Sequence, residues 1–300
     1  ICNAFVRNDG NPSIAMAATL FSSLFNVVFD YVLMFPLGLS MSGAALATAL
    51  SPIVGVLICC IHFRSKKCSI SFKSTGLSLR RLITSCQVGV SAFVGEISSG
   101  VITVAFNMII LGLAGNVGVA AYGVVANISL VAVALFNGIA QGSQPLVSES
   151  FGKGNTEDVR YAAGLAIKTA LVLAVLMIAA IYIWSDPIAS IFNSEKNMEL
   201  AAYAREGIRL YFLGFLFAGV NIVATSALSA VEAVRWAFAA SIMRGFVAIL
   251  IFAFALSALF GMAGVWLAFP AAELVTMGLS IVGLRKCIFH YYLSHCKTVA

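Results

Sequence analysis

The sequence predicts an all-α, polytopic membrane protein with eight transmembrane helices, and three observations lead to this prediction. Hydrophobic residues fill 61% of the 300 positions, charged residues fill 10%, and the mean hydropathy is +1.01. Soluble domains carry about a quarter charged residues, so a soluble enzyme, a nucleic-acid-binding protein and a disordered protein all fit poorly. Apolar runs repeatedly reach the roughly 20 residues that cross a bilayer. Runs such as 170–183 do not alternate polar and apolar residues as barrel strands do.

The eight runs follow one another along the chain, and the predicted spans are 14–36, 42–63, 86–112, 119–143, 162–184, 208–230, 236–258 and 262–284. Glycine and proline occur within them, which membrane helices tolerate. The stretch 186–207 carries six charged residues and is expected to form a short external surface helix.

Basic residues predict the orientation. With the connection 64–85 in the cytoplasm, fifteen of the eighteen Lys and Arg residues lie on or toward that side; the exceptions are Lys196, Arg205 and Arg209. This asymmetry obeys the positive-inside rule. Most cysteines fall on the same, reducing side, where thiols persist. The cluster Cys287, His290, His295 and Cys296 fits no strong zinc spacing.

Two helix pairs resemble each other. Residues 42–55 are similar to residues 263–276, with Gly43 opposite Gly264 at an offset of 221 residues. The second pair comes six helices after the first, so both cross the membrane in the same direction, which is typical of transporters built from repeated halves. We therefore expect four further helices upstream. The predicted divisions are the last two helices of an N-terminal lobe (1–63), a cytoplasmic inter-lobe linker (64–85), a six-helix C-terminal lobe (86–284) and a cytoplasmic tail (285–300).

A first polar group is expected where the first two spans face each other. Asp30 and Thr48 lie six residues from either end of the connecting turn, hence at similar depth, and Asn26 is one helical turn from Asp30. Intramembrane carboxylates are commonly functional, and oxygen ligands suit a hard cation or a proton. The alternative is an Asp that simply hydrogen-bonds within a packed interface.

Further polar residues lie in the C-terminal part of the chain. Glu96 falls near the middle of the third span, where it can attract a cationic substrate or carry a proton; the alternative is a buried, protonated Glu. Asn107, Asn127 and Asn221 either line a substrate path or bond neighbouring helices. Arg244 and Glu273 differ in depth by about 5 Å on antiparallel helices, which predicts a structural ion pair.

The chain contains no GxSxG, HExxH or GxxxxGKS motif. We therefore expect no enzymatic activity and no use of ATP by this chain. Any transport is expected to draw on an ion gradient or on a partner.

Several motifs together resemble multidrug and toxic compound extrusion (MATE) transporters. They are Arg7-Asn8-Asp9-Gly10-Asn11-Pro12, Asn26-x3-Asp30, Gly43-Ala44-Ala45-x-Ala47-Thr48, Gln141-Gly142-Ser143-Gln144-Pro145, Gly152-x-Gly154-Asn155, and Arg244-Gly245 through Gly261, Gly264-Val265-Trp266 and Pro270. The resemblance covers essentially the whole chain, in order. It implies a twelve-helix, two-lobe fold (6+6) with both termini cytoplasmic.

The resemblance also implies a function. The protein is expected to be a multi-pass multidrug efflux antiporter of the bacterial cytoplasmic membrane, which exports cationic or amphipathic compounds in exchange for Na⁺ or H⁺. No cofactor, nucleic acid or ATPase subunit is implied. Asp30, Asn26 and Thr48 match the family's first-lobe cation site, and Glu96 matches an acidic position found in some members. The acidic residue that some members carry on helix ten is not seen here, and Asn221 is the nearest polar residue. The alternatives are a lipid-linked oligosaccharide flippase of the same superfamily and a non-transporting membrane remnant.

Overall fold

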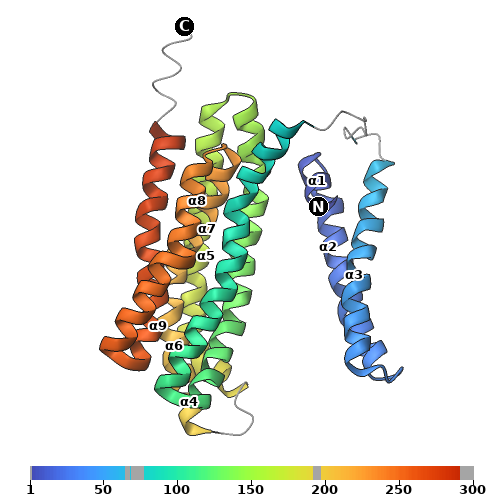
Figure 1. Ribbon diagram of the computed structural model, residues 1–300. Helices are drawn as coiled ribbons and strands as arrows, with labels where there is room; N and C mark the ends of the chain where they lie inside the picture. The colour runs from blue at the N-terminus through green and yellow to red at the C-terminus, as the bar shows by residue number, and fades with distance from the viewer. Residues whose placement is uncertain (1, 65–67, 69–77, 192–196, 291–300) are drawn as a thin grey trace. The chain divides into compact units, whose positions relative to one another are not determined.

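A computed structural model describes residues 2–64, 68, 78–191 and 197–290 (Figure 1). All regular elements in these ranges are helical, which confirms the all-α prediction. The chain divides into two compact units, Ile1–Leu77 and Ser78–Ala300. Residues 65–67 and 69–77 of the predicted linker, 192–196 of the predicted surface helix and 291–300 of the predicted tail lie outside the described residues.

The first unit consists of α1 (Cys2–Asn8), α2 (Pro12–Met34) and α3 (Ser40–Phe63). Asn11 ends the turn after α1 and caps α2, because its side-chain oxygen accepts from Ile14 N at 3.4 Å. Helices α2 and α3 pack closely: a Cβ at Gly43 would lie 2.9 Å from the backbone carbonyl carbon of Leu33. The short α1 is an element that the hydropathy pattern did not predict, because it is too short to span.

Five helical stretches are long and apolar enough to cross a membrane, and six if a bent pair counts as one span. Two of them contain 57 and 56 residues. A straight helix of that length would run about 85 Å, against a hydrocarbon core of about 30 Å. Each folds back at a glycine with positive φ instead: Gly115 (φ 60) in α4 (Leu79–Gly152) and Gly261 (φ 56) in α9 (Ala248–Leu284).

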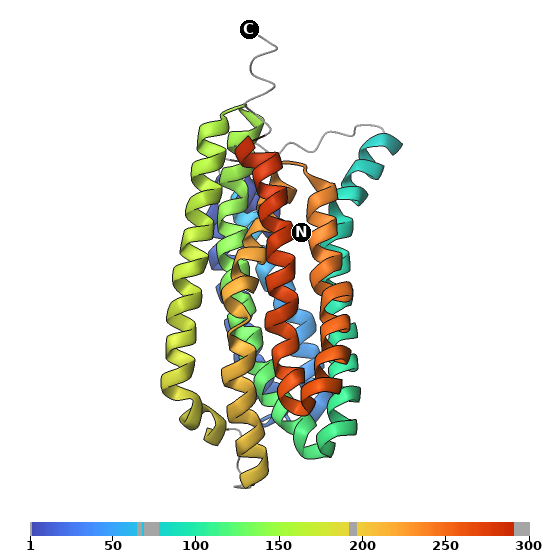
Figure 2. The ribbon, with the colours of Figure 1, turned by 90° about the vertical axis from the view of Figure 1, so that its left-hand side faces the viewer.

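Both glycines lie in the gaps between predicted spans. A positive φ costs an L-residue about 1–2 kcal/mol, so glycine is the residue that turns the chain there. Figures 1 and 2 show α4 and α9 as helical hairpins. With each hairpin counted as two crossings, the six stretches give the eight crossings that the sequence predicted.

The second unit is a helical bundle (Figure 2), and most residues of its helix α7 (Phe215–Ala230) are buried. Its core contains Phe136, Phe212, Phe215 and Trp266, all at most 1% exposed. Its further elements are α5 (Thr156–Ile191), α6 (Met198–Phe212), α7 (Phe215–Ala230), α8 (Val234–Ile242), the π-helical turn η1 (Met243–Val247) and the π-helical η2 (Arg285–His290).

Two sequence predictions are wrong in this unit. The span 208–230 is not one helix, because α6 and α7 meet at a 47° bend at Leu213–Gly214. Gly214 lets the Phe269 ring approach, since a Cβ there would lie 2.5 Å from the ring. The predicted surface helix 186–207 is wrong as a single element: its first part ends α5, which kinks at Trp184, and its last part begins α6.

Candidate functional site

The three predicted coupling residues lie on the facing helices of the first unit. Asn26 Nδ2, on α2, donates to Thr48 Oγ1, on α3, at 3.4 Å. Asp30 lies one turn further along α2, and its Oδ1 is buried without a hydrogen-bond partner among the described residues. The structure therefore joins two of the three side chains and leaves a carboxylate oxygen of the third unsatisfied.

Thr48 also lies at a weakened point of α3, which the sequence prediction missed. Pro52 has no backbone N–H, so it cannot donate to the carbonyl of Thr48 four residues earlier. Ser51 Oγ donates to that carbonyl instead, at 3.3 Å, and Ser22 Oγ of α2 donates to the Ser51 carbonyl at 2.6 Å. The sequence signal for this weak point is Pro52 itself, because a proline leaves the carbonyl four residues earlier, that of Thr48, without its helical hydrogen bond.

This arrangement has the chemistry of a small cation or proton site. A buried polar atom without a partner is unfavourable by roughly 1–3 kcal/mol, and a proton or a cation on Asp30 would relieve that penalty. Carboxylate, amide and hydroxyl oxygens are ligands that hard cations prefer. The oxygens of Asp30, Asn26 and Thr48 thus fit Na⁺ or H⁺ by residue type.

Glu96 lies at an open groove of the second unit. The groove has a volume of about 1070 Å³ and runs between α4 and α9. Among the described residues that line it, Glu96 and Ser257 carry the polar side chains, and the others are apolar or glycine. Pockets for small organic molecules have volumes of about 300–1,000 Å³. An apolar groove with a carboxylate at one side suits a lipophilic cation.

The other predicted path residues lie elsewhere. Asn107 is half-buried, and neither it nor Asn127 is among the described residues lining the groove. Asn127 Nδ2 donates to the Gly123 carbonyl of its own helix at 2.8 Å. Asn221 is fully buried and is not among the described residues lining the groove.

Asn221 instead joins the pair predicted from depth. Arg244 Nη2 lies 2.8 Å from Glu273 Oε1, and Asn221 Nδ2 donates to Glu273 Oε2 at 2.6 Å. Glu273 is 3% exposed, and both of its oxygens have partners. The carboxylate is therefore neutralised by a cation of the chain itself, which fits a structural role.

Arg244 is positioned by backbone that hydropathy does not reveal. It lies in the π-helical turn Met243–Val247, and such turns often occur at functional sites. The adjacent Gly245 packs directly against α4, because a Cβ there would overlap the Oγ and Cβ atoms of Ser98. Ser98 is two residues from Glu96, and Gly245 is next to Arg244. The contact of Gly245 with Ser98 therefore lies close in sequence to both the Arg244–Glu273 ion pair and the groove residue Glu96.

Comparisons with known proteins point to one family. The family model described as MatE matches residues 92–254, more than half of the chain. The multidrug export protein MepA of Staphylococcus aureus (strain bovine RF122 / ET3-1) is 28% identical over 303 residues, covering 100% of this chain and 64% of MepA. MepA of Staphylococcus saprophyticus is 26% identical over 301 residues, with the same coverages. The chain thus spans 64% of the length of these curated relatives.

Solved structures show the same fold. A crystal structure of MATE in complex with MaL6 superposes with a TM-score of 0.89 at 21% identity, covering 96% of this chain and 65% of that one. An outward-facing multidrug resistance MATE family transporter of the MOP superfamily gives a TM-score of 0.88 at 20% identity, covering 95% of this chain and 65% of that one.

Proposed function

Because the chain belongs to the MatE family, we propose that the protein is a secondary transporter that exports cationic or amphipathic compounds in exchange for Na⁺ or H⁺. The observation that carries the proposal is the buried, unpartnered Oδ1 of Asp30 beside the Asn26–Thr48 contact. The MepA relatives are named as export proteins, which supports the same direction of transport.

The coupling step takes place on α2 and α3. Asp30 binds H⁺ or Na⁺ and loses its net charge, and this favours a different packing of the two helices. Ser51-Pro52 gives α3 a point at which it bends, because the main-chain bond across that turn is missing. Antiport then requires only that ion and cargo prefer different conformations.

The cargo is proposed to bind the Glu96 groove. Its apolar walls accommodate a hydrophobic body, and the carboxylate attracts a positive charge. The lipid-linked oligosaccharide alternative is less favoured, because a pyrophosphate needs unpaired basic side chains and Arg244 is bound to Glu273. The proposed location is the bacterial cytoplasmic membrane, without an ATPase subunit, a cofactor or a nucleic-acid partner.

The test is ethidium efflux from cells that express the complete reading frame containing this chain, with Na⁺ and pH gradients imposed separately. Asp30→Asn should abolish gradient-driven efflux, because the amide binds neither a proton nor Na⁺ as the carboxylate does. Glu149→Gln removes an exposed carboxylate and should leave efflux unchanged. The gradient that drives efflux identifies the ion.

Two results would contradict the proposal at different points. Undiminished efflux in Asp30→Asn would remove that residue from coupling and leave Glu96 as the acid to test. Absence of efflux of ethidium and of other cationic dyes from a well-expressed protein would reject the proposed cargo.

A further inference from the structure

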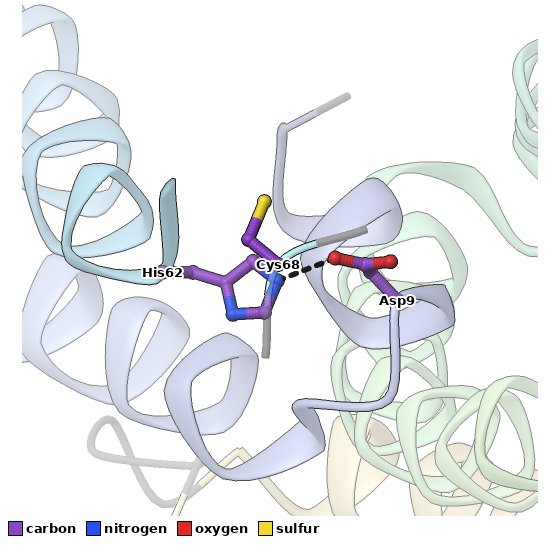
Figure 3. Close-up of side chains that lie close together, drawn as sticks. All are labelled: Asp9, His62 and Cys68. Atoms are coloured by element: carbon purple, nitrogen blue, oxygen red, sulfur yellow. Dashed lines mark hydrogen bonds and ion pairs between the residues drawn. The ribbon is translucent and has the colours of Figure 1, made fainter. Parts of the chain in front are cut away.

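Three side chains from separate stretches of the first unit meet at one end of the helix pair. Asp9 lies in the turn after α1, His62 in the last turn of α3, and Cys68 shortly beyond the end of α3 (Figure 3). One ligand atom from each lies within 4.8 Å of the other two. The sequence did not predict this group, because Asp9 is 53 residues from His62 and no metal-binding spacing joins them.

The histidine and the aspartate are already held in place. His62 Nε2 donates to Asp9 Oδ2 at 2.7 Å, and their side chains are 0% and 7% exposed. Asn11 Nδ2 donates to His62 Nδ1 at 3.3 Å, so the second ring nitrogen is also engaged. An imidazole fixed on both sides loses little conformational freedom when it binds a ligand.

The donor set is specific in its chemistry. Carboxylate, imidazole and thiolate are the three protein ligands of Zn²⁺, and Zn²⁺ prefers four of them or three plus a water. Bonds of about 2.0–2.3 Å in a tetrahedron put ligand atoms about 3.3–3.7 Å apart. Here His62 Nε2 and Asp9 Oδ2 are 2.7 Å apart, and all three ligand atoms lie within 4.8 Å of one another, so shifts of about 1 Å bring them to tetrahedral spacing. Cys68 forms no disulfide.

We propose that Asp9, His62 and Cys68 form a site for a divalent transition cation of the Zn²⁺ type, with a water in the fourth position. On binding, the Cys68 thiol releases its proton to solvent. The proton on His62 Nε2 moves to Nδ1, and the Nδ1–H donates a hydrogen bond to Asn11 Oδ1 after the Asn11 amide turns. This turn is inexpensive, because the bond that Asn11 Oδ1 makes to Ile14 N is long, at 3.4 Å.

Such an ion would join the chain beyond α3 to the turn between α1 and α2. It binds the folded unit and not the unfolded chain, so it should raise the thermal unfolding midpoint, and the rise should grow with the logarithm of the ion concentration divided by Kd. A His62–Asp9 hydrogen bond that only satisfies a buried histidine predicts neither this rise nor any role for Cys68.

The experiment is a Co²⁺ titration of the purified full chain in detergent after chelation of bound metal. We expect one equivalent of Co²⁺ to bind, with a thiolate-to-cobalt absorption band and the visible bands of four-coordinate Co²⁺. Added Zn²⁺ should displace the Co²⁺ and remove these bands. Cys68→Ser should abolish the thiolate band and weaken binding by at least about 10-fold, since even supporting residues give 10–100-fold losses. Cys60→Ser is the matched control, an exposed cysteine in the same region that should change nothing.

Asp9→Asn should weaken Co²⁺ binding without removing the thiolate band, which separates the two ligands. His62 is fully buried, so its substitution risks misfolding, and the half-buried Cys68 gives the decisive variant. The proposal is overturned if the folded protein binds no Co²⁺, if the complex lacks a thiolate band, or if the band survives Cys68→Ser.

Discussion

Glu273 and Arg244 depend on each other unequally. The carboxylate side chain is 3% exposed, whereas the guanidinium side chain is 26% exposed. Loss of Arg244 leaves a buried acid without its cation, and loss of Glu273 leaves an Arg that is only partly buried, with a long side chain able to extend toward the membrane surface. Removal of one partner of a buried pair destabilises by about 3–5 kcal/mol when the other charge stays uncompensated.

We therefore expect Arg244→Met to lower the free energy of unfolding by about 3 kcal/mol and Glu273→Gln to lower it by clearly less. In Glu273→Gln, the new amide oxygen still accepts the bond that Asn221 now donates to Glu273 Oε2 at 2.6 Å. The double variant should recover most of the loss, because no charge remains unpaired. Thermal unfolding in detergent measures all three; equal losses in the single variants, additive in the double, would argue against coupling.

At the scale of elements, the π-helical turn η1 packs closely against α4 because Gly245 has no side chain. A Cβ on Gly245 would overlap Ser98 Cβ, and rotation of the Ser98 hydroxyl does not relieve that contact. Gly245→Ala should thus destabilise by about 1–3 kcal/mol, as overpacking does. Ser98→Gly in the same chain should restore the melting temperature, and Gly138→Ala, with open space around it, is the control. Failure of the second substitution to rescue would place the strain elsewhere.

Helix ends were predictable where the backbone required a particular residue. Gly115 and Gly261 adopt positive φ in the two hairpins, and both fall in gaps between predicted apolar spans. Gly214 was missed because its φ is an ordinary −65° and the apolar run continues through it. The π-helical turn was missed for a related reason: a change of main-chain bonding leaves hydropathy unaltered.

The candidate site divides in the same way. Depth along two antiparallel helices places Arg244 beside Glu273, because a fixed rise per residue makes depth calculable. The same calculation put Asp30 level with Thr48, whereas the hydrogen bond to Thr48 comes from Asn26, one turn away. Rotation about the helix axis is not calculable from one sequence. For Asn221 the sequence therefore left two alternatives open, a substrate path or a bond to a neighbouring helix, and in the structure its side chain bonds Glu273. The Asp9–His62 contact joins a turn to a helix end, so no periodicity pointed to it.

For the whole molecule, the orientation rests on the uneven distribution of Lys and Arg and stays a prediction. The boundary between the compact units, Leu77–Ser78, lies within the predicted cytoplasmic connection 64–85. Cys86 and Met41 are both exposed; Met41 lies at the start of α3, and Cys86 lies beyond the end of α3, in α4. The positive-inside rule places Cys86 toward the cytoplasm and Met41 outside.

Single-cysteine versions that carry either Cys86 or Met41→Cys, with the other cysteines replaced, make this orientation measurable. A membrane-impermeant maleimide should label Met41→Cys in intact cells, and it should label Cys86 only in inside-out vesicles. A permeant maleimide serves as control, because it should label both. The reverse pattern would invert the predicted topology and place the Asp30 group nearer the cytoplasmic side of the membrane. Labelling of both from one side would mean that α3 does not cross, although its 24 apolar-rich residues are long enough to do so.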